Sequence, residues 1–275
     1  MHLVGRSREL GILRSGLDRP EAAVHRISGL SGVGKTSLVQ EAAGDFPSVY
    51  HRVPPLPDFS QRHELASTLR ASLTDLGGAP VEIPSDPSWA DLLGVPLQLP
   101  AQRRSIVLVL DDAHRLSEAR SRVAPAIQRA LRQARDVGRA LHVVLVSPIK
   151  SGDPEDFGGT DVVIPPLSFR AAAPLLPGAS SEHRLRSYAV FGGVPAHLTR
   201  LDPGASFNAN LRRAILEPGA PLGDTGLTLL ERAVQTPARY VAILSSLSRG
   251  EGSWRTVHEG VPDLTRSGQV APYLN

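Results

Sequence analysis

The sequence contains no cysteine and almost no lysine. The absence of cysteine excludes disulfide bonds, cysteine-ligated zinc and thiol catalysis, and it is compatible with the cytosol. Lysine occurs only at Lys35 and Lys150, so arginine supplies nearly all of the basic charge, with a net charge of +3 and a pI of about 9.7. Such a bias is typical of a GC-rich gene, although arginine also suits bidentate contacts with phosphate. Lys35 stands out because it lies between a glycine and a threonine.

Long apolar runs are also absent. No stretch reaches the roughly 18 apolar residues that a membrane helix needs. Residues 1–10 carry several charges and lack the apolar core of a secretory signal, so we expect a cytoplasmic protein. The hydrophobic fraction of 41% and the charged fraction of 21% are those of an ordinary globular protein. A length of 275 residues favours two or three structural units.

Apolar strand patterns alternate with helical patterns over the first 165 residues. We expect buried strands at residues 22–28, 49–53, 106–110, 141–146 and 162–164. We expect helices at residues 7–18, with Ser7 as the N-cap, and at residues 35–43, 61–76 and 117–137. Residues 77–100 are rich in proline and glycine and are expected to form a loop with a short turn near Trp89. This alternation predicts an α/β domain with a doubly wound parallel sheet.

The character of the sequence changes after Pro165 and Pro166. Residues 169–216 contain short helical patterns interrupted by proline and glycine, and no strand pattern follows. A helical stripe returns at Tyr240, Ile243, Leu244 and Leu247. We therefore expect three parts: an α/β domain at residues 1–165, a helical segment at 166–222 and a small helical domain at 223–275.

A glycine-rich loop follows the first predicted strand and precedes a predicted helix. Residues 29–36 (GLSGVGKT) match the pattern G-x-x-x-x-G-K-[ST], the Walker A motif, in full. Glycines allow backbone N–H groups to surround phosphate oxygens, the lysine binds the β- and γ-phosphates, and the threonine hydroxyl ligates Mg²⁺. The pattern predicts binding of a nucleoside triphosphate, ATP with Mg²⁺, by Gly29, Ser31, Gly32, Val33, Gly34, Lys35, Thr36 and Ser37.

Two acids follow the third predicted strand. Residues 105–110 (SIVLVL) lead directly into Asp111 and Asp112, a Walker B pattern. In P-loop proteins the first acid holds Mg²⁺ and the next orients the attacking water. We expect Asp111, with Thr36, on the metal side and Asp112 as the catalytic base, although Asp is shorter than the Glu often found there. Ser147, at the end of the next strand, is either a nucleotide-sensing residue or the start of a turn.

The order of these motifs resembles that of a known family. Residues 4–10 (VGRSREL), 108–116 (LVLDDAHRL), 166–170 (PLSFR) and 191–195 (FGGVP) are similar to segments of the archaeal-type ATPases within the STAND and AAA+-related P-loop NTPases. The resemblance implies that residues 166–222 form a helical lid. It also implies that Pro195 lies against the adenine and that Gly5 and Arg6 lie near the base from the other side. Residues 223–275 resemble a partly truncated winged-helix segment, with residues 263–274 at the recognition position.

One departure from the family limits the expected turnover. Family members carry a basic residue shortly before the last strand, whereas residues 156–161 (DFGGTD) contain no arginine. We therefore expect slow hydrolysis of ATP to ADP and phosphate. The chain would then be a nucleotide-dependent switch that acts on a protein partner, and an oligomer is compatible with this scheme.

Two other functions compete with the switch. One is nucleotide-controlled DNA binding of the origin-binding AAA+ type, through Arg239, Arg249, Arg255 and Arg266 in the tail. Acidic residues offset these arginines, and a salt-dependent affinity for duplex DNA would favour this function. The other is a P-loop kinase, which would produce a phosphorylated acceptor instead of free phosphate alone.

Overall fold

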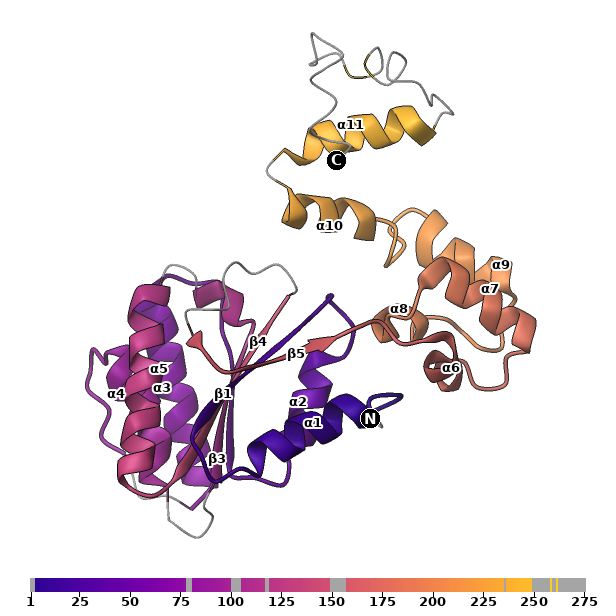
Figure 1. Cartoon of the computed structure of the whole chain (residues 1–275). Helices are drawn as coiled ribbons and strands as arrows, with labels where there is room; N and C mark the ends of the chain where they lie inside the picture. The colour runs from indigo at the N-terminus through magenta and orange to yellow at the C-terminus, as the bar shows by residue number, and fades with distance from the viewer. Residues whose placement is uncertain are drawn as a thin grey trace. The chain divides into compact units, whose positions relative to one another are not determined.

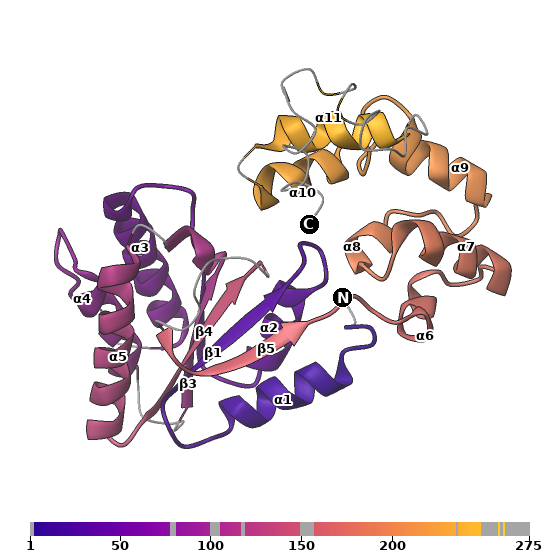
Figure 2. The ribbon, with the colours of Figure 1, turned by 45° about the horizontal axis from the view of Figure 1, so that its top comes forward.

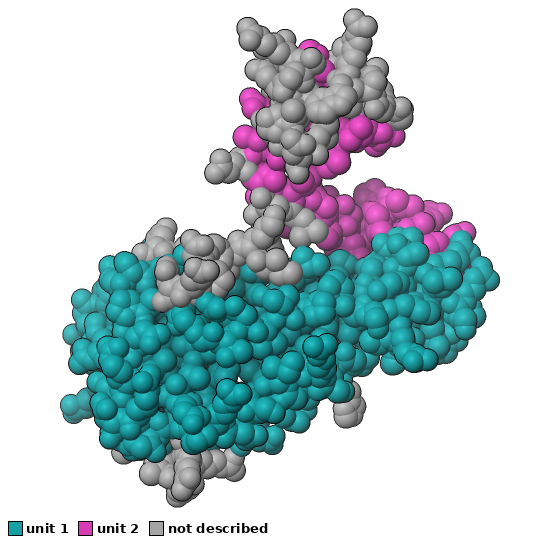
Figure 3. All heavy atoms as spheres, in the orientation of Figure 1, with its two compact units in different colours: residues 1–204 teal, residues 205–275 magenta. Residues whose placement is uncertain are grey.

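The structure is a computed structural model that describes residues 3–77, 81–99, 105–116, 119–148, 157–234 and 236–248, together with His258 and Val261. The chain divides into two compact units, residues 1–204 and residues 205–275 (Figure 3). The first unit holds the sheet and α1 to α8; α9 to α11 belong to the second. The three-part division expected from the sequence stays a prediction. In the described residues no helix combines the length and the apolar composition needed to cross a membrane.

A parallel five-stranded sheet in the order β2-β3-β4-β1-β5 forms the centre of the first unit (Figures 1 and 2). The strands are β1 Ala23–Gly29, β2 Ser48–Arg52, β3 Ser105–Asp111, β4 Ala140–Ser147 and β5 Thr160–Ile164. The helices of this unit are α1 Ser7–Leu17, α2 Lys35–Ala43, α3 Asp58–Asp75, α4 Trp89–Gly94, α5 Arg120–Asp136, α6 Phe169–Ala172, α7 Ser181–Phe191 and α8 Pro195–Leu198. The doubly wound α/β fold expected from the sequence is confirmed.

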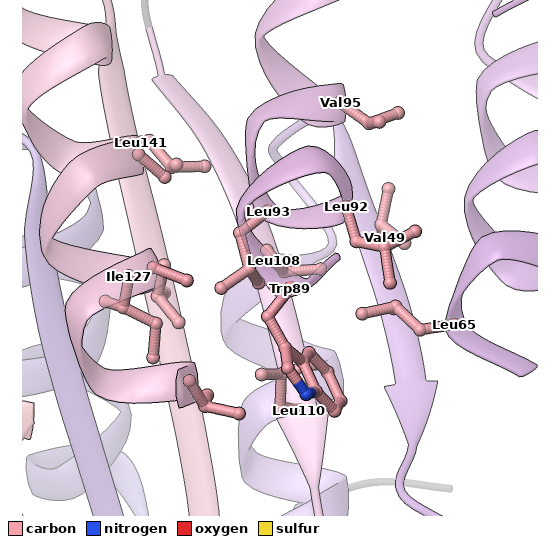
Figure 4. Close-up of a cluster of buried hydrophobic side chains, with 14 of the residues drawn as sticks. Val49, Leu65, Trp89, Leu92, Leu93, Val95, Leu108, Leu110, Ile127 and Leu141 are labelled. Carbon is pink, nitrogen blue, oxygen red and sulfur yellow. The ribbon is translucent and has the colours of Figure 1, made fainter. Parts of the chain in front are cut away.

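Each face of the sheet buries its own apolar cluster. In β3, Ile106, Leu108 and Leu110 pack toward α3, α4 and α5, as Figure 4 shows around Trp89 and Leu92. The residues between them, Val107 and Val109, pack toward α1 and α2. Because alternate residues of a strand point to opposite faces, burial on both faces requires the continuous apolar run that the sequence shows.

Several boundaries differ from those expected. Helix α1 has Arg6, not Ser7, as its N-cap, because the backbone of Ser7 is already helical. Helix α3 begins at Asp58, directly after Pro57, because its apolar stripe starts one turn later than the helix itself. The turn expected near Trp89 is the short helix α4, which Ser88 begins with a reciprocal capping box.

The described part of the second unit is helical. It contains α9 Phe207–Leu211, a π-helical turn at Arg212–Leu216, α10 Thr225–Ala233 and α11 Pro237–Ser248. Helix α11 includes the predicted stripe from Tyr240 to Leu247. The expected recognition helix at residues 263–274 lies outside the described residues, so the winged-helix segment stays a prediction.

Two histidines meet in the sheet at the end far from the 29–36 loop. His25 Nε2 lies 3.2 Å from His142 Nδ1, and His142 Nε2 lies 3.1 Å from the carbonyl oxygen of Arg19. Both side chains are buried, and His51 of β2 is buried as well. Burial, with the neighbouring His142, lowers the pKa of His25 to about 4, and burial lowers the pKa of His51 to about 4.

The low pKa values of His25 and His51 predict that the free energy of unfolding decreases in mild acid. Their folded pKa values lie below the unfolded value, so the unfolded chain binds more protons between pH 4 and 6.5. The stabilisation is complete above pH 6.5 and is lost as the pH falls toward 4, with each tenfold difference in proton affinity worth about 1.4 kcal/mol. Urea unfolding should give a lower free energy of unfolding at pH 5 than at pH 7, and His25→Gln should reduce that difference. Equal stability at both pH values would contradict it.

Candidate functional site

The loop of residues 29–36 joins the end of β1 to the start of α2. Gly32 and Gly34 have φ of 78° and 97°, in the left-handed region that favours glycine. Gly34 is the N-cap of α2 and contributes no side-chain cap, so the amino end of the helix keeps its N–H groups for another acceptor. A helix amino end of this kind suits an anion. Ser31 and Ser37 are exposed beside it.

The loop is packed closely against the sheet. A Cβ at Gly29 would lie 2.6 Å from the carbonyl oxygen of Ile164 in β5, and the side chain of Val33 is fully buried. The glycine at position 29 therefore permits the close approach of β5, and Val33 anchors the loop in the apolar cluster on the α1 and α2 face. The packing of Gly29 against β5 and of Val33 in the apolar cluster thus positions the backbone of the loop.

The ammonium of Lys35 bonds to its own loop. Nζ donates to the carbonyl oxygens of Gly29 and Leu30, each at 2.9 Å. Burial lowers the pKa of Lys35, and the nearby carboxylates of Asp111 and Asp112 oppose that shift. These carbonyl bonds hold the cation at the mouth of the loop, where an incoming phosphate would replace neutral acceptors with charged ones.

Asp111 joins the loop to β3. Its Oδ2 accepts a hydrogen bond from Thr36 Oγ1 at 2.7 Å and a second from the hydroxyl of Tyr50. Its Oδ1 accepts from the backbone N–H of Asp112 at 2.8 Å. Burial and the hydrogen bond to Asp111 raise the pKa of Tyr50, so the phenol stays a donor. The structure brings together Thr36 and Asp111, the two residues expected at the metal.

Asp112 lies in a separate charged cluster. Its Oδ2 accepts from Arg52 Nε at 2.9 Å and lies 3.2 Å from Arg115 Nη1. Arg52 ends β2 and is 70% exposed, and its hydrogen bond to Asp112 raises the pKa of the guanidinium. Asp112 itself has φ of 57°, the one described residue other than glycine with a positive φ. The role of Asp112 as a base stays a prediction, and in this structure two arginines hold one of its oxygens.

Sequence patterns did not single out Tyr50, Arg52 or Arg115. The strand register pairs Arg52 with Asp111, so any side chain near the end of β2 is brought to the acids. The only sequence signal for Tyr50 and Arg52 is their place at the end of a strand, which identifies a partner only when the strand order is known.

The oxygen atoms at this site suit Mg²⁺. Magnesium is bound through one or two protein oxygens together with substrate phosphates and water. The Thr36 hydroxyl and the Asp111 carboxylate lie within hydrogen-bond distance of each other at the amino end of α2. No cluster of three or more His, Asp or Glu side chains in the described part of the chain forms a complete metal cage. The residues present therefore fit a magnesium ion that is shared with a nucleotide.

Arg6 binds the backbone of the loop through a buried side chain. Its side chain is 3% exposed, and Nη2 donates to the carbonyl oxygens of Val33 at 3.1 Å and Pro165 at 2.6 Å. A Cβ on Gly5, where φ is 66°, would lie 2.8 Å from Cβ of Ala171. Gly5 and Arg6 thus connect α1, the 29–36 loop and the start of α6. A position near the nucleotide base stays a prediction for both residues.

Residues 193–196 lie against the same loop. The backbone N–H of Ala196 donates to Gly32 O at 3.2 Å, and a Cβ on Gly32 would lie 2.7 Å from Cβ of Ala196. Leu167 N donates to Gly193 O at 2.7 Å, and a Cβ on Gly193 would lie 1.9 Å from Leu167 O. The motifs 166–170 and 191–195 therefore pair with each other. Pro195 is the first residue of α8, next to Ala196, and its contact with adenine stays a prediction.

Comparison with known proteins supports the class of fold. No protein-family model and no curated protein matches this chain. A Walker-type ATPase of Pyrococcus abyssi is similar in structure with a TM-score of 0.65, 16% identity and coverage of 96% of this chain and 85% of that chain. Drosophila ORC bound to DNA gives a TM-score of 0.50 and 16% identity over 99% of this chain and 75% of that one. The chain has the α/β fold of a P-loop NTPase.

A STAND protein with a tetratricopeptide repeat sensor from Pyrococcus horikoshii is also similar. Its TM-score is 0.42 at 19% identity, over 83% of this chain and 34% of that chain.

The bonds of Arg6 generate a prediction for the loop. Arg6→Gln should lower the free energy of unfolding by about 3 kcal/mol, because two carbonyl oxygens lose a charged, buried donor. It should also weaken nucleotide binding at least tenfold, measured by calorimetric titration, because the Val33 end of the loop is released. The exposed Arg8 of α1 provides the control, and Arg8→Gln should change neither quantity. Wild-type affinity in a folded Arg6→Gln variant would contradict this role for Arg6.

Proposed function

We propose that this chain binds ATP with Mg²⁺ through the 29–36 loop. The observation that carries the proposal is the 2.7 Å hydrogen bond from Thr36 Oγ1 to Asp111 Oδ2, which joins the loop to the acid at the end of β3. A glycine-lined loop, a lysine at its mouth and a free helix amino end supply the phosphate contacts. The choice of ATP over GTP rests on the resemblance noted in the sequence.

Lys35, Thr36 and Asp111 each have a defined task in this proposal. Bound Mg²⁺ would neutralise charge on the β- and γ-phosphates. The Thr36 hydroxyl would ligate the ion, and Asp111 would hold its water shell. Tyr50 keeps Asp111 in place through the hydrogen bond to Oδ2. Lys35 would leave the carbonyl oxygens of Gly29 and Leu30 and bind phosphate oxygens.

We propose that hydrolysis is slow. Asp112 is the candidate to orient and deprotonate the attacking water, but Arg52 and Arg115 both bond to its Oδ2. A carboxylate oxygen that already accepts two charged donors is occupied, so it is not available to accept a hydrogen bond from the attacking water. Breaking these ion pairs would therefore precede efficient turnover.

The contact between Gly32 and Ala196 supports a switch. Phosphates bound by residues 32–35 would contact the same stretch of backbone whose Gly32 carbonyl accepts a hydrogen bond from Ala196 of α8. The state of the nucleotide would then be transmitted to the helical segment that begins at residue 166, and from there to a protein partner. This STAND-type role explains why the family motifs at 166–170 and 191–195 lie together beside the loop.

DNA binding is the second candidate. It is favoured by the likeness to ORC, whose structure is bound to DNA. Three of the four tail arginines that would contact phosphate lie at residues 249, 255 and 266, outside the described residues. The 29–36 loop would bind nucleotide under both proposals. The switch remains the leading proposal because its contacts lie within the described residues, whereas most of the DNA-binding arginines do not.

Two variants test the switch. Lys35→Ala removes the phosphate-binding cation and should abolish ATP binding, whereas Asp112→Asn should retain binding and lose phosphate release. A partner captured by the Asp112→Asn chain with ATP, but not by the Lys35→Ala chain, is the expected result of a pull-down. Identical partners for both variants and the wild type would refute the switch, and ATP binding by Lys35→Ala would refute the site.

Arg52 provides an independent prediction about turnover. Arg52→Ala should raise the rate of phosphate release about three- to tenfold at saturating ATP, because Asp112 loses its shorter ion pair and its Oδ2 becomes accessible to the attacking water. The affinity for ATP should stay within about twofold, since Arg52 does not contact the loop. Arg8→Ala, also on the surface, should leave the rate unchanged. An unchanged or lower rate in Arg52→Ala would show that Arg52 does not restrain Asp112.

A further inference from the structure

A second cavity lies apart from the 29–36 loop, among α3, α4 and the amino-terminal half of α5. Its volume is about 410 Å³. Small-molecule sites have volumes of about 300 to 1,000 Å³ and combine apolar walls with a few placed polar groups. The apolar part of this cavity includes Trp89, Pro125 and Ala126. No function proposed above uses it.

Three arginines and one aspartate line the cavity. Asp58 accepts hydrogen bonds from Trp89 Nε1 at 2.7 Å and from Arg62 Nε at 3.2 Å, and it forms an ion pair with Arg122 Nη2 at 3.3 Å. Arg62 also pairs with Asp86 at 2.6 Å. Hydrogen bonds from Ser88, together with the nearby charge of Arg129, lower the pKa of Asp91. Arg122 and Arg129 are exposed on α5. The lining residues include three arginines and one aspartate, while Asp86 and Asp91, outside the lining, offset part of that positive charge; the exposed Arg122 and Arg129 carry the guanidinium groups that a ligand can reach.

Pro125 gives the wall a second polar feature. Proline has no N–H, so the carbonyl of Ser121, four residues earlier in α5, cannot receive its usual helical hydrogen bond. Both Ser121 and Pro125 line the cavity. The same turn therefore offers a hydroxyl, a carbonyl oxygen without its helical donor, and the guanidinium of Arg122.

We infer that this cavity is a binding site for a small organic anion, with a carboxylate or phosphate held by Arg122 and Arg129 and an apolar body packed beside Trp89 and Pro125. Guanidinium groups bind either acid through paired hydrogen bonds. Asp58, whose side chain is 17% exposed, orients Arg62 and Arg122 through its ion pairs and disfavours a second negative group beside it. An anion of this class enters from the open side, where the arginines lie.

The cavity is connected to Asp112 through Gln61 and Arg115. Gln61 of α3 lies next to Arg62 and is 3% exposed; its Nε2 donates to Pro54 O and to Arg115 O, both at 3.1 Å. Arg115 in turn bonds to Asp112. Arg122 and Arg62 share Asp58, so a ligand that draws Arg122 from Asp58 changes the contacts of Arg62 and, through the neighbouring Gln61, the position of Arg115; it thereby changes phosphate release. This coupling rests on the proposed function, whereas the binding site does not.

Trp89 gives a direct measure of binding. The chain has two tryptophans, and Trp254→Phe leaves Trp89 as the fluorophore. Phenyl phosphate and phenylacetate should each cause a saturable change in Trp89 fluorescence, and neutral benzyl alcohol should not. The tighter of the two anions identifies the preferred acid.

Variants in the same background locate the site. Arg122→Gln with Arg129→Gln should weaken binding at least tenfold while circular dichroism stays unchanged, because both side chains are exposed. Arg132→Gln, also exposed on α5, should bind as the parent does. Lys35→Ala should also bind normally, because the cavity is separate from the loop. Loss of binding in Lys35→Ala, equal binding by the arginine double variant, equal binding of benzyl alcohol, or no binding of either anion to the folded chain would each overturn the inference.

The coupling is measured separately, as phosphate release from ATP with and without saturating phenyl phosphate. A change of at least twofold in the parent and no change in the arginine double variant supports it. A probe that binds without altering the rate overturns the coupling. Absence of phosphate release without any probe is instead a failure of the proposed function, and fluorescence titration still decides the binding site.

Discussion

The hydrogen bond between Thr36 and Asp111 links two segments whose strands are separated in the sheet by β4. In the order β2-β3-β4-β1-β5, strand β4 lies between β3, which ends at Asp111, and β1, from which the 29–36 loop leads to Thr36 at the start of α2. Strands β1 and β3 are therefore roughly 10 Å apart. The side chains must therefore meet above the end of β4, where Ser147 lies. The loop after β1 has to reach over the end of the sheet, and the contacts of Arg6, Ile164 and Ala196 with the loop hold it there. A sheet without β4 in this position would bring the two residues together with no need for such support.

The support comes from three directions. Arg6 holds the carbonyl of Val33 from below, β5 packs against Gly29, and Ala196 bonds to Gly32 from the start of α8. Each contact is made to backbone, which leaves the N–H groups at the amino end of α2 for a ligand. A charged side chain in a buried position is costly unless it is paired; Nη2 of Arg6 donates to two backbone oxygens, and Nη1 pairs with Glu9. The buried arginine therefore stabilises loop geometry and does not serve as a surface charge.

Local sequence patterns predicted the individual helices and strands of this fold but not which strands lie next to one another. The helix at Lys35–Ala43 and the strand at Ser105–Asp111 were identifiable because a full motif or an unbroken apolar run marks them. The strand order was not predictable, because the central strands β3 and β4 are apolar on both faces and no sequence pattern records which strand edges pair. For the same reason Tyr50 and Arg52 were missed, since they act on Asp111 and Asp112 only through the pairing of β2 with β3. The cavity beside Trp89 depends on three helices from separate segments, and no single segment contains its pattern.

The backbone at Asp112 constrains which acid can occupy this position. A φ of 57° places the residue in a region that aspartate and asparagine enter more readily than other side chains. Replacement by glutamate would lengthen the reach of the carboxylate toward a water molecule but would strain the main chain by about 1 to 2 kcal/mol. Adaptive change toward faster chemistry would therefore require the turn after β3 to be rebuilt together with the acid. The short side chain is thus a consequence of the turn that presents it.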